Sequence, residues 1–272
     1  MNKADYEEPR CVLCGKPGET EKAEPVPVGR ILDRLNQYEE AGDLPAAERH
    51  LNYWLTEAES LGDKRGQLAL HNEMMGFYRM RGNGETAQRH AEGALRLLDE
   101  LEMGDTITAG TVRVNAGTVR EAFGDPVGGL DLFEQARKNY EQHLDPTDSR
   151  LGGLYNNMAL SLTACGRFGE AETMFRKALS VMEKQEHGEP EQAITWLNLA
   201  DNAAAAYGEV EAEGMIGEYL DKAQQLLDTE TIPRNAYYAF VCEKCAPVFG
   251  HYGYFAEEAE LRERVKRIHD RN

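Results

Sequence analysis

The stretch Tyr155-Asn156-Asn157-Met158-Ala159, followed by Gly166, Ala171, Phe175 and Ala178, decides the fold of this 272-residue chain. The same pattern recurs about every 42 residues. Its glycine returns at intervals of 42 and 42 residues, as Gly82, Gly124 and Gly166. Its last alanine returns at intervals of 42, 42 and 45 residues, as Ala94, Ala136, Ala178 and Ala223. A repeat of this length predicts helix pairs that must stack into a solenoid, because no pair buries its apolar stripe alone.

Five windows of the chain share the pattern that predicts the first helix of each pair. They are His71–Met75, Arg113–Gly117, Tyr155–Ala159, Trp196–Ala200 and Cys242–Ala246. The predicted second helices carry small residues, such as Ala87 and Ala171, where helices must approach closely. Together these features resemble tetratricopeptide repeats. The period of 42 residues, longer than the usual 34, is similar to that of kinesin light chain and of bacterial peptide-sensing regulators.

The resemblance implies an all-α fold, a right-handed superhelical solenoid of about six helix-turn-helix repeats. We expect a leader over residues 1–30 and the solenoid over residues 31–272. The repeats are expected at about 31–64, 68–101, 110–145, 152–186, 193–228 and 236–269. The first and last are expected to be atypical, because one face of each has no neighbouring repeat.

Composition agrees with an all-helical protein and narrows its location. The chain is 41% hydrophobic and 29% charged, and no segment approaches 18 uncharged apolar residues, so no transmembrane helix is expected. Residues 1–10 contain three acids and no apolar core, which argues against a secretory signal. Five cysteines, an odd number, fit a reducing compartment. We therefore expect a cytoplasmic protein.

Charge and missing motifs exclude several classes of function. The formal net charge is −18, with 30 basic against 48 acidic residues, so nucleic acid is not an expected partner. No polybasic run predicts binding to a membrane. The sequence contains no phosphate loop, dinucleotide fingerprint, zinc-protease motif or nucleophile elbow, so we expect no enzymatic activity.

Asparagines recur in the predicted first helices. Asn115, Asn157 and Asn198 occupy one position of successive repeats, and Asn72 and Asn156 lie one residue earlier. In the resembling family this position faces a concave groove. An amide side chain offers two donors and an acceptor, which suits it to hold the backbone of an extended peptide. Specificity is then expected from neighbouring side chains, among them Arg79, Thr118, Glu121 and Asp201.

A second interpretation of the asparagines stays open. Their side chains can instead bond to the adjacent helix and fix the packing of the repeats. Asparagine costs roughly 0.5 to 0.7 kcal/mol relative to alanine inside a helix, so its recurrence in four repeats indicates some purpose. The sequence does not distinguish the two interpretations.

Two CxxC motifs lie near opposite ends of the chain. Cys11 and Cys14, followed by Gly15, resemble a zinc knuckle, which supplies two thiolate ligands. No cysteine or histidine follows before residue 37, so the remaining ligands are expected from Cys242 and Cys245. Such a zinc site closes within one chain or joins two chains in a head-to-tail homodimer. The alternatives are separate packing roles or redox chemistry of the thiols.

These patterns lead to one functional prediction and two alternatives. We expect an adaptor that holds an extended protein or peptide segment in the groove, with a four-cysteine zinc site joining the two CxxC motifs. The first alternative is a zinc or thiol redox switch, or a holdase chaperone. The second is a peptide-sensing regulator that lacks its own DNA-binding domain.

Overall fold

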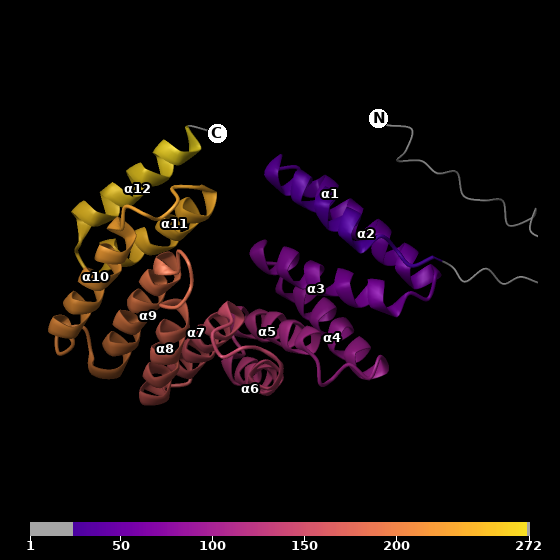
Figure 1. The fold of residues 1–272 in the computed structure, drawn as a ribbon, viewed down its shortest axis with the longest axis horizontal. Coiled ribbons are helices and arrows are strands. Elements are labelled where there is room, and N and C mark those ends of the chain that lie inside the picture. The colour runs from indigo at the N-terminus through magenta and orange to yellow at the C-terminus, as the bar shows by residue number, and fades with distance from the viewer. Residues whose placement is uncertain (1–23, 271–272) are drawn as a thin grey trace, which may run out of the picture. The chain divides into compact units, whose positions relative to one another are not determined.

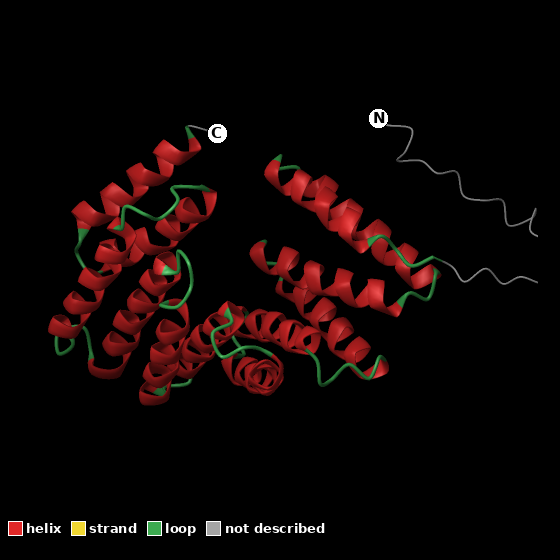
Figure 2. Ribbon diagram, viewed as in Figure 1, coloured by secondary structure: helices red, strands yellow, loops and turns green. Residues whose placement is uncertain are grey.

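The computed structural model describes residues 24–270, which form twelve α-helices and no strand (Figures 1 and 2). The helices are α1 Val28–Glu40, α2 Leu44–Ser60, α3 Lys64–Met80, α4 Gly84–Glu100, α5 Ile107–Ala122, α6 Pro126–His143, α7 Ser149–Ala164, α8 Phe168–Met182, α9 Glu189–Tyr207, α10 Glu213–Asp228, α11 Ala236–His251 and α12 Phe255–His269. This confirms the all-α prediction. The predicted boundary between leader and solenoid, at residue 30, falls inside α1.

The chain divides into two compact units, Met1–Gln67 and Leu68–Asn272, with the boundary in the first turn of α3. In the first unit, α1 and α2 bury Ile31 and Leu51. The backbone N–H of Val26 donates to Asp63 Oδ2 over 3.0 Å. This bond attaches the segment before α1 to the turn between α2 and α3. None of the helices in the described part of the chain is long and apolar enough to cross a lipid bilayer.

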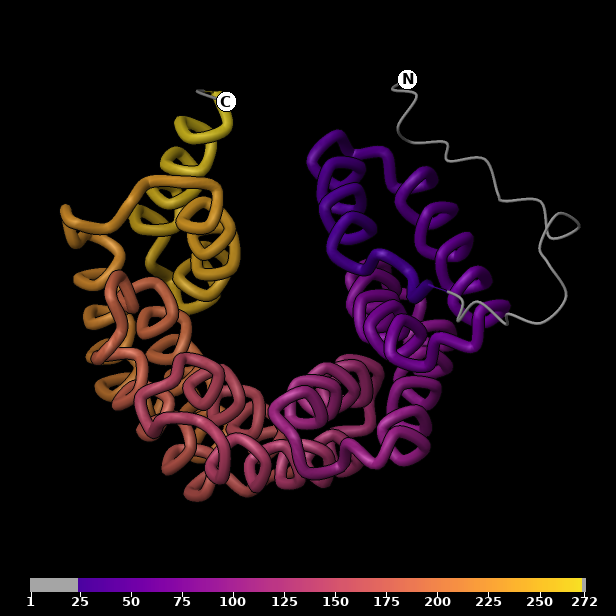
Figure 3. Tube along the Cα trace, turned by 45° about the vertical axis from the view of Figure 1, so that its right-hand side comes forward, coloured from indigo at the N-terminus to yellow at the C-terminus, as the bar shows by residue number. Residues whose placement is uncertain are grey.

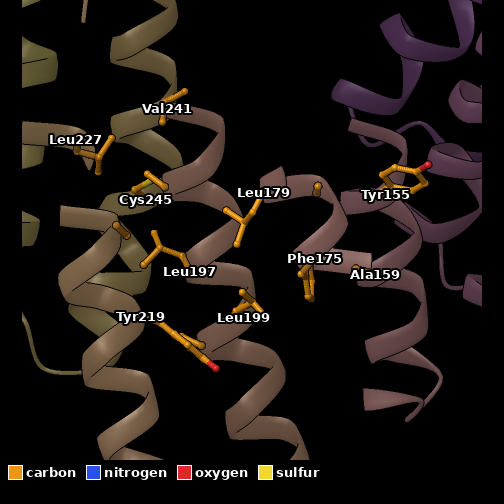
Figure 4. Packing of buried hydrophobic residues seen from close by; sticks show 14 of the residues in the cluster. Tyr155, Ala159, Phe175, Leu179, Leu197, Leu199, Tyr219, Leu227, Val241 and Cys245 are labelled. Carbon is orange, nitrogen blue, oxygen red and sulfur yellow. The ribbon is translucent and has the colours of Figure 1, made fainter. Parts of the chain in front are cut away.

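In the second unit, helices α4 to α12 follow one another in chain order (Figure 3). One hydrophobic cluster extends from α6 to α12 and includes Phe133, Phe175, Leu197 and Phe249. Phe175 and Leu197 are among the residues of this cluster that Figure 4 labels. The first helices α5, α7 and α9 each pack against the second helices on both sides, and α11 packs against α12 and α9. The buried faces of neighbouring repeats therefore form one continuous core, as stacked repeats require.

The recurring glycines end the first helices. Gly82, Gly124 and Gly166 all have positive φ, with 73° at Gly166, a conformation that costs glycine little. The Gly166 N–H donates to the Thr163 carbonyl over 2.9 Å, and the Arg167 N–H donates to the Leu162 carbonyl over 2.9 Å. These two bonds satisfy carbonyls at the end of α7, as in a Schellman motif. The constant spacing of the glycine along the chain therefore marks the turn within each helix pair.

Small residues allow close approach inside a pair. Gly117 of α5 lies against the ring of Phe133 of α6, and a Cβ atom at Gly117 would lie 2.6 Å from Phe133 Cε1. The repeating alanines of the second helices are also enclosed, since Ala136 and Ala223 are 0% exposed. The period seen in the sequence is thus a period of helix contacts.

Candidate functional site

A groove of about 640 Å³ lies within the second unit, between the first helices α3, α5, α7, α9 and α11. Seven of the nine residues predicted to contact a peptide line it. They are Asn72, Arg79, Asn115, Thr118, Asn156, Asn157 and Asn198. The repeat register places them there, because equivalent positions of successive first helices face the same side of the stack.

Four of the asparagines pair across neighbouring repeats. Asn115 Nδ2 donates to Asn72 Oδ1 over 2.9 Å, which joins α5 to α3. Asn198 Nδ2 donates to Asn156 Oδ1 over 3.0 Å, which joins α9 to α7. These bonds agree with the packing interpretation. They also leave polar capacity, because each donating asparagine keeps a second N–H and its carbonyl oxygen.

Asn157 differs from the other four. Its side chain lines the groove and is half-buried, and it makes no hydrogen bond to any residue in the described range 24–270. The amide therefore presents two donors and one acceptor to whatever occupies the groove. Among the five asparagines, Asn157 fits the peptide-holding interpretation best.

The charged and hydroxyl side chains predicted beside the asparagines have different surroundings. Thr118 Oγ1 donates to the Val114 carbonyl over 2.9 Å, a bond within α5. Burial raises the pKa of Glu121, and the nearby Arg79 guanidinium opposes this shift. Arg79 lines the groove, whereas Glu121 is not among the lining residues. These two opposite charges therefore lie close together at the end of the groove that α3 and α5 form.

Asp201 is not among the residues that line the groove. Its Oδ1 atom accepts a hydrogen bond of 2.8 Å from the hydroxyl of Tyr252, the residue that ends α11. Partial desolvation raises the pKa of Asp201, and the Tyr252 bond opposes this shift. This carboxylate therefore joins α9 to the residue that caps α11.

Several lining residues were missed by the sequence prediction. They are Glu73, Ile194, Leu197, Phe240, Lys244 and Val248, among others. Phe240 is 48% exposed, stacks with Tyr237 at 6.3 Å between ring centroids, and lies 5.5 Å from Lys244 Nζ. A signal was present, because Lys244 occupies in Cys242–Ala246 the position that asparagine holds in three other repeats.

Comparison with known proteins identifies the architecture. The family profile described as "Tetratricopeptide repeat" matches residues 152–184, which contain all of α8 and all of α7 except its first three residues. The fold is a tetratricopeptide repeat solenoid. No curated protein sequence matches the chain.

Solved structures resemble this tetratricopeptide repeat solenoid over most of its length. BtubC (BKLC) from P. vanneervenii is 18% identical, with a TM-score of 0.64, over 77% of this chain and 84% of that one. PilW, described as a type IV pilus biogenesis factor, is 17% identical, with a TM-score of 0.58, over 89% and 97%. A putative kinesin light chain from Podosopora anserina is 16% identical, with a TM-score of 0.53, over 75% and 96%. These likenesses confirm the predicted fold.

The cysteines predicted to bind zinc have separate surroundings. Cys242 and Cys245 are 0% and 1% exposed in α11 of the solenoid and belong to its hydrophobic cluster, in which Figure 4 labels Cys245. Burial raises the pKa of both thiols, whereas zinc binds thiolates. Cys11 and Cys14 lie outside the described residues. Within residues 24–270, no three histidine, cysteine, aspartate or glutamate side chains gather as a metal site.

Proposed function

We propose that this protein is a non-enzymatic scaffold that holds an extended segment of another protein in the groove of its second unit. The observation that carries the proposal is the row of amide side chains on aligned first helices, with Asn157 unpaired. Backbone amides of a bound segment bond to such side chains whatever the segment's own side chains are. Each such bond contributes about 0.5 to 1.5 kcal/mol net.

The groove combines this polar row with apolar surface. Ile194, Leu197 and Val248 line it beside the asparagines, and Phe240 exposes about half of its surface. Binding sites commonly join apolar contact area, which supplies affinity, to a few placed polar groups, which fix orientation. The fold class by itself supports protein binding and names no partner.

A matched pair of variants tests the proposal. Asn157→Arg places a long charged side chain in the groove, whereas Gln88→Arg places the same group at an exposed position of α4 outside it. Each variant and the wild type are used as bait, and bound proteins are quantified by mass spectrometry. We expect Asn157→Arg alone to lose specific partners. Equal capture by both variants would show that partners bind elsewhere.

The four-cysteine zinc site remains a separate proposal. To bind zinc, Cys242 and Cys245 must lose their protons and leave the hydrophobic cluster, so their burial favours packing over ligation. The thiol-switch alternative meets the same obstacle. Native mass spectrometry of untagged protein tests both the metal and the proposed homodimer. One zinc per chain, lost in Cys11→Ser and in Cys242→Ser, supports a shared site, and metal-free wild-type protein refutes it.

We further propose that the scaffold works in the cytoplasm, since its cysteine content suits a reducing compartment. Fluorescence microscopy of the tagged chain in its source cells tests this location. Signal confined to a compartment outside the cytoplasm would contradict it.

A further inference from the structure

Equivalent positions of the five first helices form one row along the groove. The row is Glu73, Asn115, Asn157, Asn198 and Lys244. These residues follow one another at 42, 42, 41 and 46 positions, and all five line the groove. The row therefore begins with a carboxylate on α3, continues with three neutral amides, and ends with an ammonium group on α11.

The two end charges are available to a ligand. Glu73 Oε1 accepts only a long hydrogen bond, 3.3 Å, from Asn72 Nδ2 among the described residues. Lys244 Nζ lies over the ring of Phe240 and has no carboxylate partner within residues 24–270. Arg79 also lines the α3 end, where Glu121 lies close enough to interact with it. The charge left over is negative at the α3 end and positive at the α11 end.

The apolar side chains that line the groove are also distributed unequally between its two ends. Ile194 and Leu197 of α9 and Phe240 and Val248 of α11 gather at the Lys244 end. At the other end, the apolar lining of α3 and α5 consists of Val114 beside Gly76. One end of the groove therefore suits an apolar side chain next to an acidic one, and the opposite end suits a basic side chain.

We propose that the groove reads the direction of its ligand: an extended segment with a basic side chain at Glu73 and with apolar and acidic side chains at Lys244. This inference rests on the proposed peptide-binding function. Neighbouring packed helices are about 8 to 10 Å apart, so four intervals span roughly 32 to 40 Å. At about 3.3 Å per residue, a segment of about 10 to 12 residues covers the row.

The test is selection of a random twelve-residue peptide library displayed on phage. The baits are the full-length wild type, the charge-exchanged variant Glu73→Lys/Lys244→Glu, and a control, Glu92→Lys/Lys266→Glu. The control exchanges charges at exposed positions of α4 and α12 outside the groove, and all three baits carry the same net charge. Thermal unfolding establishes that each bait is folded. Should the exchanged variant not fold, Lys244→Gln replaces it and is expected to lose only the acidic selection.

We expect wild type and control to enrich peptides with one constant order of basic and acidic residues, and the exchanged variant to enrich the opposite order. In fluorescence anisotropy, the wild type should bind the consensus peptide about tenfold more tightly than the same peptide with its charges exchanged. Enriched peptides without charge order, or with an order that the exchange leaves unchanged, would overturn the inference and leave the scaffold function standing. No enrichment over the Asn157→Arg bait would overturn both.

Discussion

Asn156 and Asn157 are neighbours in α7 and both line the groove, yet their replacement by alanine should have different consequences. Alanine is the better helix former by about 0.6 kcal/mol, so both variants gain this amount. Asn156→Ala also removes the acceptor of the 3.0 Å bond from Asn198, which contributes about 1 kcal/mol. Asn157→Ala removes no hydrogen bond within the described part of the chain.

The expected result is a stability gain of about 0.6 kcal/mol for Asn157→Ala and a loss of about 0.4 kcal/mol for Asn156→Ala. The difference of about 1 kcal/mol reports the hydrogen bonds that Asn156 accepts, from Asn198 and, over a longer 3.3 Å, from Thr195, because the gain in helix propensity is common to both variants. For a unit of this size, it corresponds to about 2 to 4 °C in Tm. Urea unfolding followed by circular dichroism measures the difference directly.

A double-mutant cycle between Asn156 and Asn198 supplies the control. If the bond exists, the two alanine substitutions should be coupled by about 1 kcal/mol, whereas Asn157 and Asn198 should be additive. For Asn157→Ala, peptide affinity should fall about fivefold although the stability of this variant rises. Equal stability of the two single variants, with no coupling, would refute the packing role of Asn156.

Three further predictions concern the solenoid itself. Gly117→Ala should lower the free energy of unfolding by about 1 to 3 kcal/mol, because its Cβ meets a buried ring. Gly153→Ala in α7 has open space at its Cβ, so it should raise the free energy of unfolding by about 1 kcal/mol, and urea unfolding measures both. Ser161→Ala should raise stability by about 1 kcal/mol in the same assay, since its buried hydroxyl has no partner among the described residues; a loss would reveal a bonded hydroxyl. Burial lowers the pKa of both His71 and His90, each to about 4, below the unfolded value near 6.5. The unfolded chain then binds more protons, so stability should fall as pH drops from 6.5 towards 4, by up to about 1.4 kcal/mol per pH unit for each proton. His90→Gln should flatten this dependence, and an unchanged slope would contradict it.

The fold was predictable because its determinants are local and repeated. Gly166 is needed where φ is positive at the end of α7, and Gly117 is needed where a ring presses against α5. The glycine of positive φ returns in successive repeats, as Gly82, Gly124 and Gly166, so the sequence displays it several times. The division into two units at Gln67 and Leu68 was not predictable in this way, because the repeat pattern is the same at every boundary between repeats.

The groove was predictable only in part. Repeat register identified the asparagines, since equivalent positions face the same side. Lys244 holds the equivalent position in α11 and also lines the groove, but it is not an asparagine and was not part of the predicted site. Asp201 was assigned to the groove, although Tyr252 holds it at the end of α11. Such contacts depend on the length and angle of individual helices, which a repeat pattern does not encode.

The pairing of asparagines changes how the two interpretations of the row relate to each other. An amide bonded to its neighbour loses rotational freedom, and the entropy of fixing it is then part of folding. Asn72 and Asn115 are held together in this way, as are Asn156 and Asn198. Their remaining donors and acceptors therefore meet a ligand already oriented, which lowers the cost of ordering the site on binding. Under the proposed function the same bonds serve both packing and recognition, so loss of a packing asparagine should weaken binding as well as stability.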